Sequence, residues 1–309
     1  MKKQTFLYLL FCFAWFQGDT CVTAKETTSD HSLLVTTQGL ADHLKDPSLV
    51  ILHIGRKETF EKNHIPGARL FSLKAMMTRT PEGNDHELAS ITVLDALYES
   101  VGISNDSNVI ICYDSEKWAM WAGFVYVGLD YVGMGSRTFV LDGGLPKWMA
   151  EKRATTSEVP AVRAGELHTQ RHQDMIATTD WLEHNLDNPD VVIVDARGEE
   201  AYTGTYKDKR LPKHGHITGA FNLFYWDLMT EKKPIVFKRT DQLESLFSEN
   251  GMKPGALVVP YCDTGIFAAQ VYFVAKHLGY ETRFYDASFQ EWSRDDTRPV
   301  TEPVSVHLK

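Results

Sequence analysis

The chain has 309 residues, of which 43% are hydrophobic and 24% charged, and its formal net charge is -9 at pH 7. That length exceeds what one ordinary hydrophobic core fills, so we expect two domains. The composition is typical of soluble globular proteins, and the negative charge argues against nucleic acid or an anionic membrane as the main partner. Small anionic substrates are not excluded, because the local field of a site can oppose the net charge.

The N-terminus has the features of a secretory signal peptide. Lys2 and Lys3 supply positive charge, and residues 6–16 form an apolar run that is too short to span a bilayer. Small residues then precede a cleavage position after Ala24. We therefore expect residues 1–24 to be removed and the mature protein to be periplasmic or secreted. Nothing later in the sequence is long and apolar enough to predict a membrane-spanning helix.

Cleavage would leave two of the four cysteines. Cys12 and Cys21 would go with the signal peptide, and Cys112 and Cys262 would stay. Two thiols in an exported chain of this size do not make a disulfide framework. A single bridge between the two is the alternative that the sequence leaves open.

The two halves of the chain repeat the same segments in the same order. The four pairs of segments are 50–56 with 191–197, 64–68 with 216–220, 108–114 with 256–262, and 141–148 with 285–292. Four matches in one order indicate a duplicated domain. The second copy carries extra residues before its second match, around positions 204–213.

Each copy alternates short β-branched runs with amphipathic stretches. Leu243, Leu246 and Phe247 keep helical spacing, as do the apolar positions of residues 273–278. Apolar runs followed by helices predict βα units around a mainly parallel sheet. The expected organisation is a domain over 30–150, a polar linker over 151–172, a second domain over 173–300 and a tail over 301–309.

The segment from residue 258 to residue 268 is chemically the most informative. An apolar run ends at Cys262, a tight turn follows, and a helical pattern continues to Leu278. A cysteine placed there lies near loop N–H groups and the positive end of a helix, where anions bind and thiols ionise. Gly265 would allow the tight turn. These residues alone also permit a structural cysteine that is buried at the end of a strand.

Together these segments resemble the tandem-domain rhodanese family, which includes thiosulfate sulfurtransferase and 3-mercaptopyruvate sulfurtransferase. The likeness runs from about residue 34 to residue 292. Its strongest parts are residues 195–197, 215–223, 261–262 and 285–292. The resemblance implies an α/β fold with two rhodanese-like domains, each a mainly parallel five-stranded sheet flanked by helices.

The resemblance also implies a division of labour between the halves. Only the second half would be catalytic, with Cys262 as the nucleophile, and Asp114 would occupy the same position in the first half. The Cys262 thiolate would take a sulfane sulfur from a small-molecule donor and hold it as a persulfide. A thiol, a thiol protein or cyanide would then accept that sulfur. Cys112 would be a core residue of its strand.

Further site residues follow from the resemblance. Arg197 would hold the anionic group of the donor, since a guanidinium binds carboxylates and sulfur oxyanions in bidentate fashion; a structural ion pair is the alternative. His216 and Asp195 would be structural, and Trp148 and Trp292 would pack in the core. The substrate-binding loop would consist of Asp263, Thr264, Gly265, Ile266 and Phe267.

The loop departs from the family pattern. Thiosulfate-specific members place basic residues after the cysteine and mercaptopyruvate-specific members place small neutral ones, whereas this chain has Asp263 and Thr264. A carboxylate beside the thiol opposes ionisation and repels a dianionic donor. Phe267 also replaces a hydroxyl-bearing residue. We therefore expect an organic donor, such as one resembling 3-mercaptopyruvate, in preference to thiosulfate.

A basic segment in the second copy has two interpretations. It either supplies a positive field near the cleft or is a solvated loop. Its charged residues are Lys207, Lys209, Arg210, Lys213 and His214.

The residues bear on three possible functions. An exported sulfurtransferase agrees best with the residues, and a sulfur-carrier or binding module with little turnover is the alternative. A phosphatase with a Cys-x5-Arg loop is disfavoured, because Ala268 stands where the arginine is needed. The sequence has no zinc-ligand spacing and no glycine-rich nucleotide loop, so we expect no cofactor and no metal. A monomer is expected from the resemblance.

Overall fold

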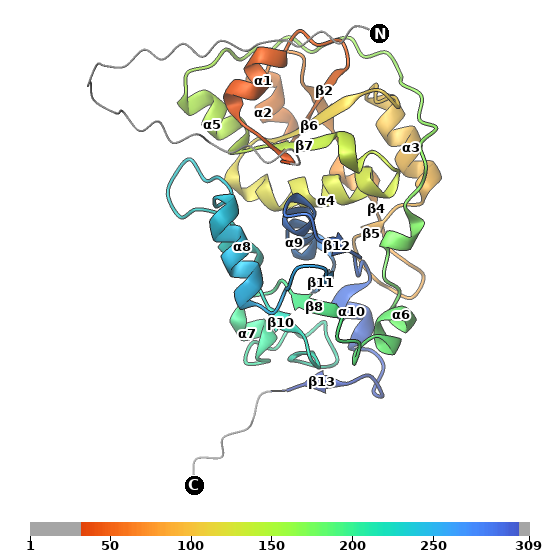
Figure 1. The fold of residues 1–309 in the computed structure, drawn as a ribbon. Helices are drawn as coiled ribbons and strands as arrows, with labels where there is room; N and C mark the ends of the chain where they lie inside the picture. The colour runs from red at the N-terminus through yellow and green to blue at the C-terminus, as the bar shows by residue number, and fades with distance from the viewer. Residues whose placement is uncertain (1–31, 303–309) are drawn as a thin grey trace, which may run out of the picture. The chain divides into compact units, whose positions relative to one another are not determined.

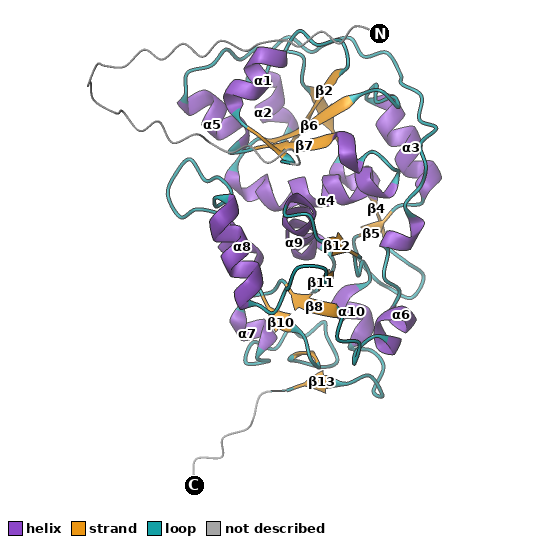
Figure 2. Ribbon diagram, viewed as in Figure 1, coloured by secondary structure: helices purple, strands orange, loops and turns teal. Residues whose placement is uncertain are grey.

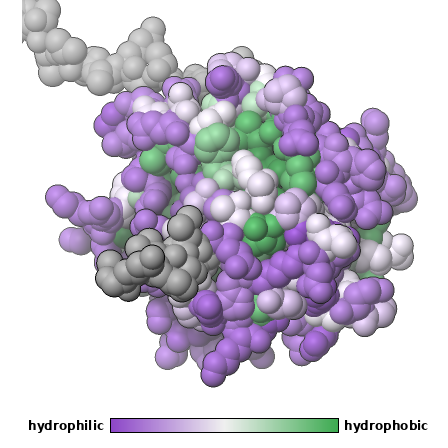
Figure 3. Space-filling model, turned by 90° about the horizontal axis from the view of Figure 1, so that it is seen from below, coloured by the Kyte–Doolittle hydropathy of each residue, from purple (hydrophilic) through white to green (hydrophobic). Residues whose placement is uncertain are grey.

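A computed structural model of the protein describes residues 32–302. The predicted signal peptide, with Cys12 and Cys21, and residues 303–309 of the predicted tail lie outside this range. The described residues form two α/β halves, and in each half helices cover both faces of a sheet (Figures 1 and 2). Figure 3 shows a surface that is mainly hydrophilic, with hydrophobic side chains gathered toward its middle.

The first half contains five parallel strands, as predicted. Their order across the sheet is β1 (Leu34–Val35), β7 (Thr138–Leu141), β6 (Asn108–Tyr113), β2 (Leu49–Ile54) and β3 (Arg69–Phe71). The apolar side chains of successive strand residues alternate between two core clusters, one on each face of the sheet. One face is covered by α1 (Thr37–His43), α2 (Lys57–Lys62) and α5 (Gly144–Ala150), and the other by α3 (Ile91–Ser100) and α4 (Ala119–Tyr131).

The second half contains four parallel strands where five were predicted. Their order is β10 (Phe221–Asn222), β8 (Val191–Asp195), β11 (Leu257–Tyr261) and β12 (Glu281–Thr282). At the fifth position the chain makes only a parallel bridge between Ile176 and Phe284. Two backbone hydrogen bonds close this bridge, which is too few for a strand. The prediction of five strands was therefore wrong for the second half.

Helices cover the second sheet in the same way. The predicted helical spacings are confirmed by α8 (Thr240–Glu249) and α9 (Ile266–His277), which share a core cluster with the first half. The opposite face is covered by α6 (Thr179–His184) and α10 (Ser288–Trp292). The remaining short elements are α7 (Glu199–Tyr202), the antiparallel pair β9 (His216–Ile217) and β13 (Val300–Thr301), and the antiparallel pair β4 (Met77–Thr78) and β5 (Glu87–Leu88).

The register of the strands confirms the internal repeat. In the first sheet Ile54 pairs with Tyr113, and in the second Asp195 pairs with Tyr261. The residue after each of these tyrosines therefore occupies the same place in its half. This equivalence confirms the predicted match between Asp114 and Cys262.

The two halves pack through α4 and α9. Gly123 lets the helices approach closely, because a Cβ at that position would stand 2.6 Å from the carbonyl oxygen of Ala269. Two aspartate side chains join the halves reciprocally. Asp142 accepts the N–H of Phe237 at 2.9 Å, and Asp286 accepts the N–H of Leu88 at 2.8 Å.

The segment predicted as a linker has no helix or strand between residues 151 and 172. It follows the first half closely, since Leu167 is buried and its N–H donates to the Glu99 carboxylate at 2.8 Å. Within residues 32–302, every helix is too short or too polar to span a bilayer.

Candidate active site

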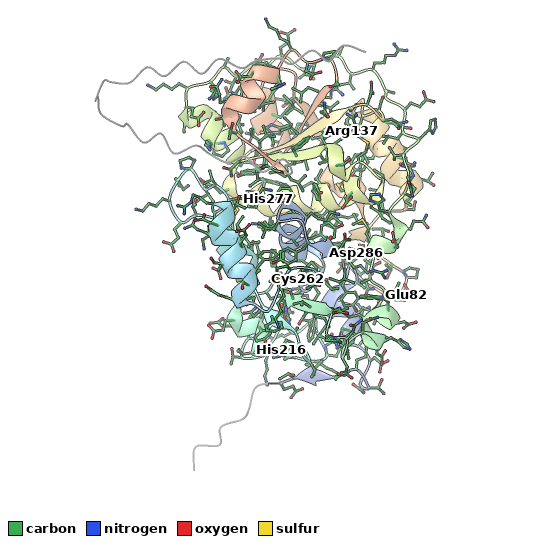
Figure 4. The ribbon with its side chains drawn as sticks, in the orientation of Figure 1. Glu82, Arg137, His216, Cys262, His277 and Asp286 are labelled. Carbon is green, nitrogen blue, oxygen red and sulfur yellow. The ribbon has the colours of Figure 1, made fainter. Side chains whose placement is uncertain are left out.

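Cys262 lies directly after β11, in the turn that leads into α9 (Figure 4). Its Sγ accepts the N–H of Gly265 at 3.1 Å. Gly265 is the residue before α9 and has φ +90°, a left-handed conformation that glycine adopts without steric cost. The turn thus folds back on the thiol, as the sequence predicted.

The N–H of Cys262 itself does not face the thiol. It donates to Ser288 Oγ at 3.2 Å, and that hydroxyl donates to the carbonyl of Tyr285 at 3.0 Å. Ser288 is fully buried with φ +55°, a conformation that costs a non-glycine residue about 1–2 kcal/mol. Such strain is concentrated at functional sites. The N–H of Cys262 is therefore not one of the loop N–H groups that surround the sulfur.

The thiol is less acidic than its surroundings suggested from sequence. Burial raises the pKa of Cys262 to about 11, the Asp263 carboxylate adds to this, and the N–H groups of Ala268, Thr264 and Phe267 act in the opposite direction. Desolvation of the anion therefore outweighs the hydrogen bonds. The resting thiol is protonated at neutral pH, which corrects the expectation that this position ionises it.

Arg197 is held in a buried network and is 3% exposed. Its Nε donates to Asp195 Oδ1 at 2.9 Å, and its Nη2 donates to Asp195 Oδ2 and to the Gly215 carbonyl, each at 2.6 Å. The guanidinium also lies 4.3 Å from the ring centre of Phe289. Burial alone would lower the pKa of Arg197, but Asp195 raises it, so the residue is cationic.

The remaining nitrogen of this guanidinium contacts the loop after Cys262. Arg197 Nη1 donates to Asp263 Oδ1 at 3.2 Å. Burial raises the pKa of Asp263 and Arg197 opposes that shift. The arrangement shows the structural ion pair that was the alternative for Arg197, and binding of the donor by this residue stays a prediction.

A pocket of about 250 Å³ opens onto the thiol. Asp263, Thr264, Ile266 and Phe267 of the loop line it, and the ring of Phe267 stacks on Tyr225 with 4.3 Å between centroids. The remaining lining comes from other parts of the chain: His86, Met120 and Trp121 from the first half, and Arg210 from the longer segment of the second copy. Sequence reasoning missed the three first-half residues, because no local pattern marks them.

Arg210 is the residue of the basic segment that lines the thiol pocket. Its Nε and Nη2 are held by the Asp208 carboxylate at 2.5–3.1 Å, while the side chain stays 75% exposed. The Asp208 carboxylate therefore fixes the orientation of the guanidinium, while Nη1 is left accessible. Lys213 turns away and donates to the carbonyls of Asp295 and Arg298. One residue of the segment thus reaches the thiol pocket.

The other residues singled out in the sequence are structural. His216 stacks on Tyr202 and its Nδ1 contacts the Tyr202 carbonyl at 2.8 Å. Trp148 and Trp292 are buried, as predicted. Cys112 is a free thiol in the core of the first half, and Cys262 is also free. Across residues 32–302 no group of three His, Cys, Asp or Glu side chains could hold a metal ion.

Comparisons with known proteins agree with this geometry. The model of the rhodanese-like domain matches residues 36–151 and again 178–295. The chain is 32% identical to the thiosulfate sulfurtransferase of Pseudomonas aeruginosa over 88% of its own length and 98% of that protein. It is 28% identical to the sulfur carrier protein TtuD of Thermus thermophilus, covering 84% of this chain and 93% of the relative.

A solved structure supports the fold. The 3-mercaptopyruvate sulfotransferase SseA from Escherichia coli superimposes with a TM-score of 0.70 at 22% identity, covering 82% of this chain and 98% of SseA.

Proposed function

Because this chain belongs to the rhodanese family and is a sulfurtransferase, we propose that it moves sulfur as a persulfide on Cys262, from an organic donor to a thiol acceptor. The single observation that carries the proposal is the position of Cys262 Sγ. It accepts a loop N–H and faces a pocket that both halves line. The equivalent Asp114 of the first half has no sulfur to offer.

Sulfur transfer at this position takes two balanced steps. The Cys262 thiol gives up its proton, and its sulfur forms a bond to the donor's sulfur while the carbon–sulfur bond of the donor breaks. The electron pair of that bond and a proton leave with the donor's carbon skeleton. In the second step the acceptor thiolate attacks the outer sulfur of the persulfide. The electron pair of the broken bond returns to Cys262 Sγ, which is reprotonated. No external oxidant or reductant is needed.

The pocket supports an organic donor in preference to thiosulfate. The aromatic and thioether side chains of Trp121, Phe267 and Met120 suit a carbon skeleton. The accessible guanidinium of Arg210 suits a single carboxylate. Asp263 adds negative charge beside the sulfur, which disfavours a dianion. Arg210, and not the buried Arg197, is the residue that this geometry favours as the anion-binding group.

The sulfur-carrier function has specific support as a second candidate. A thiol with a pKa of about 11 is rarely ionised at neutral pH, which favours slow turnover. One of the relatives is named a sulfur carrier protein. Both functions share the Cys262 persulfide and differ in the rate at which a small acceptor removes the sulfur.

The test separates these two functions. The purified protein is incubated with 3-mercaptopyruvate and, separately, with thiosulfate, and the rate of sulfur release to a small thiol is followed. Faster loading from 3-mercaptopyruvate than from thiosulfate, with repeated turnover, supports the enzyme and its donor preference. Loading without turnover supports the carrier, and loading from thiosulfate alone contradicts the preference for an organic donor.

Export and a monomeric state complete the proposal. The support for export is the charged and apolar N-terminal pattern up to Ala24. N-terminal sequencing of the protein recovered outside the cytoplasm should begin at Lys25, and a full-length cytoplasmic protein would contradict export. Sedimentation of the mature protein at the mass of one chain would support the monomer.

A further inference from the structure

The short segment of the first half that reaches the thiol pocket is held by the region around α10 of the second half. Asp85 and Leu88, on either side of His86, both form hydrogen bonds with residues of the second half. Gln290 pairs its side-chain amide with both backbone groups of Asp85: Oε1 accepts the Asp85 N–H and Nε2 donates to the Asp85 carbonyl, each at 2.9 Å. Asp286 accepts the Leu88 N–H at 2.8 Å.

His86 is strained between these two attachments. Its φ is +64°, one of three positive φ values among the non-glycine residues described. A conformation of this kind persists only where the surroundings over-determine it. Here the paired amide on one side and the Asp286 carboxyl group on the other supply that constraint.

The strained residue points at the catalytic loop. His86 Nδ1 lies 3.3 Å from Thr264 Oγ1, and the imidazole lines the same pocket as Cys262. The N–H of Thr264 is one of the groups that favour the Cys262 thiolate. His86 therefore contacts the side chain of Thr264, the residue whose N–H favours the Cys262 thiolate.

Gln290 is attached to the catalytic loop as well. Its own N–H donates to the Asp263 carbonyl at 3.1 Å, and its side chain is buried. One residue thus bonds the residue after the nucleophile and the residue before His86. Its counterpart in the first copy is Pro146, which has neither an N–H nor an amide side chain.

From this geometry we propose that Gln290 is a positioning residue for sulfur transfer. By pairing with Asp85 it holds His86 against Thr264, so that the non-catalytic half completes the site around Cys262. The proposal rests on the proposed function of Cys262. It concerns the reactivity of the thiol, which can be measured without any sulfur donor.

The test is a double-mutant cycle on the alkylation of Cys262 by iodoacetamide, recorded against pH. Gln290→Leu and His86→Ala should each slow alkylation at neutral pH about fivefold, the equivalent of one hydrogen bond. If Gln290 acts through His86, the double variant is no slower than His86→Ala alone. The pH profile of Gln290→Leu should also move toward higher pH.

Two further variants complete the design. Gln290→Glu keeps the acceptor for the Asp85 N–H and loses the donor, so its rate should fall between those of wild type and Gln290→Leu; it also replaces Gln290→Leu in the cycle if that variant does not fold. Asp142→Ala removes the reciprocal bond between the halves, at a residue that does not line the thiol pocket, and should alkylate at the wild-type rate.

The proposal is overturned if Gln290→Leu reacts like wild type, if the two losses multiply in the double variant, or if Asp142→Ala slows the reaction equally. Failure of the proposed function looks different, because wild-type Cys262 would then be alkylated normally yet never take up sulfur.

Discussion

The turns after β6 and β11 occupy the same place in two copies of one fold, yet only the second presents a reactive atom to a pocket. In the first, Asp114 Oδ2 accepts the N–H of Arg56 at 2.9 Å, and a Cβ at Gly55 would overlap with the carboxylate. In the second, Cys262 Sγ accepts the N–H of Gly265. The turn after β6 thus gives its carboxylate to the neighbouring turn after β2, whereas the turn after β11 presents its sulfur to a pocket.

The arginines that follow the neighbouring strands differ in the same sense. Arg56 is exposed, whereas its counterpart Arg197 is buried between Asp195 and Asp263. The first half has Ile54 where the second has Asp195. The comparison teaches that the scaffold forms with either set of residues, and that this buried arginine–carboxylate network belongs to the half that carries the thiol.

The largest expected effect breaks this network. Arg197→Met leaves two carboxylates in a buried setting without their cation, which should lower the free energy of unfolding by about 3–5 kcal/mol. Urea denaturation measures the change. The matched variant Arg56→Met, at the exposed position of the first half, should change stability by less than about 0.5 kcal/mol. Equal losses in both variants would contradict the contrast between the halves.

The first half has a buried titratable group of its own. His53 is fully buried, neither ring nitrogen has a partner in the structure, and burial lowers its pKa to about 4 from 6.5. The unfolded chain binds this proton first, so the stabilisation is complete above pH 6.5 and is lost as the pH falls toward 4. The loss amounts to about 3 kcal/mol.

Substitution by the residue of the second copy isolates this contribution. The counterpart of His53 is Val194, so His53→Val should flatten the decline in stability between pH 6.5 and 4. Burial raises the pKa of Asp286 to about 8, but that residue is present in both proteins and cancels in the difference. Parallel stability curves for the two proteins would refute the assignment to His53.

The acidity of the thiol tests the role of Asp263. Alkylation of Cys262 should rise about tenfold per pH unit from pH 7 to 10, because the thiolate is the nucleophile and its pKa is about 11. Asp263→Asn should lower that pKa by up to about one unit, less if Arg197 already screens the carboxylate. A thiol titrating near pH 8 in the wild type would overturn this account of the site.

The smallest effect concerns the strained residue below the thiol. Ser288 has φ +55° where the first copy has Gly144 with φ +53°. Ser288→Ala and Ser288→Gly both remove the bond to the Cys262 N–H, but only glycine also relieves the backbone. Ser288→Gly should therefore be the more stable of the two by about 1 kcal/mol in thermal unfolding, and the reverse order would argue against strain at this position.

Much of the fold was predictable because it depends on local sequence patterns that occur twice. Apolar runs and helical spacings predicted the parallel sheets, and the repeat predicted that Asp114 and Cys262 occupy equivalent positions in the two copies. The prediction of a fifth strand in the second sheet was wrong, because the short stretch around Ile176 makes only one bridge. Nothing in the local sequence distinguishes such a bridge from a strand.

The site was predictable only in part. The resemblance pointed to Cys262 and its loop, which the structure places at one pocket. His86, however, contacts Thr264 across 178 positions of sequence, and no spacing encodes that contact. The burial that raises the Cys262 pKa likewise depends on how the two halves pack. Arg197 was expected to face the substrate, but it is buried in ion pairs with Asp195 and Asp263. The sequence contains these charged residues but does not give the distances between them.

The most direct test of the central claim is the intact mass of the protein after exposure to a sulfur donor. The account predicts a gain of one sulfur atom that a thiol or cyanide removes, that persists in Cys112→Ala and that is absent in Cys262→Ser. A Cys262→Ser protein that still takes up sulfur, or a wild-type protein that never does, would contradict it.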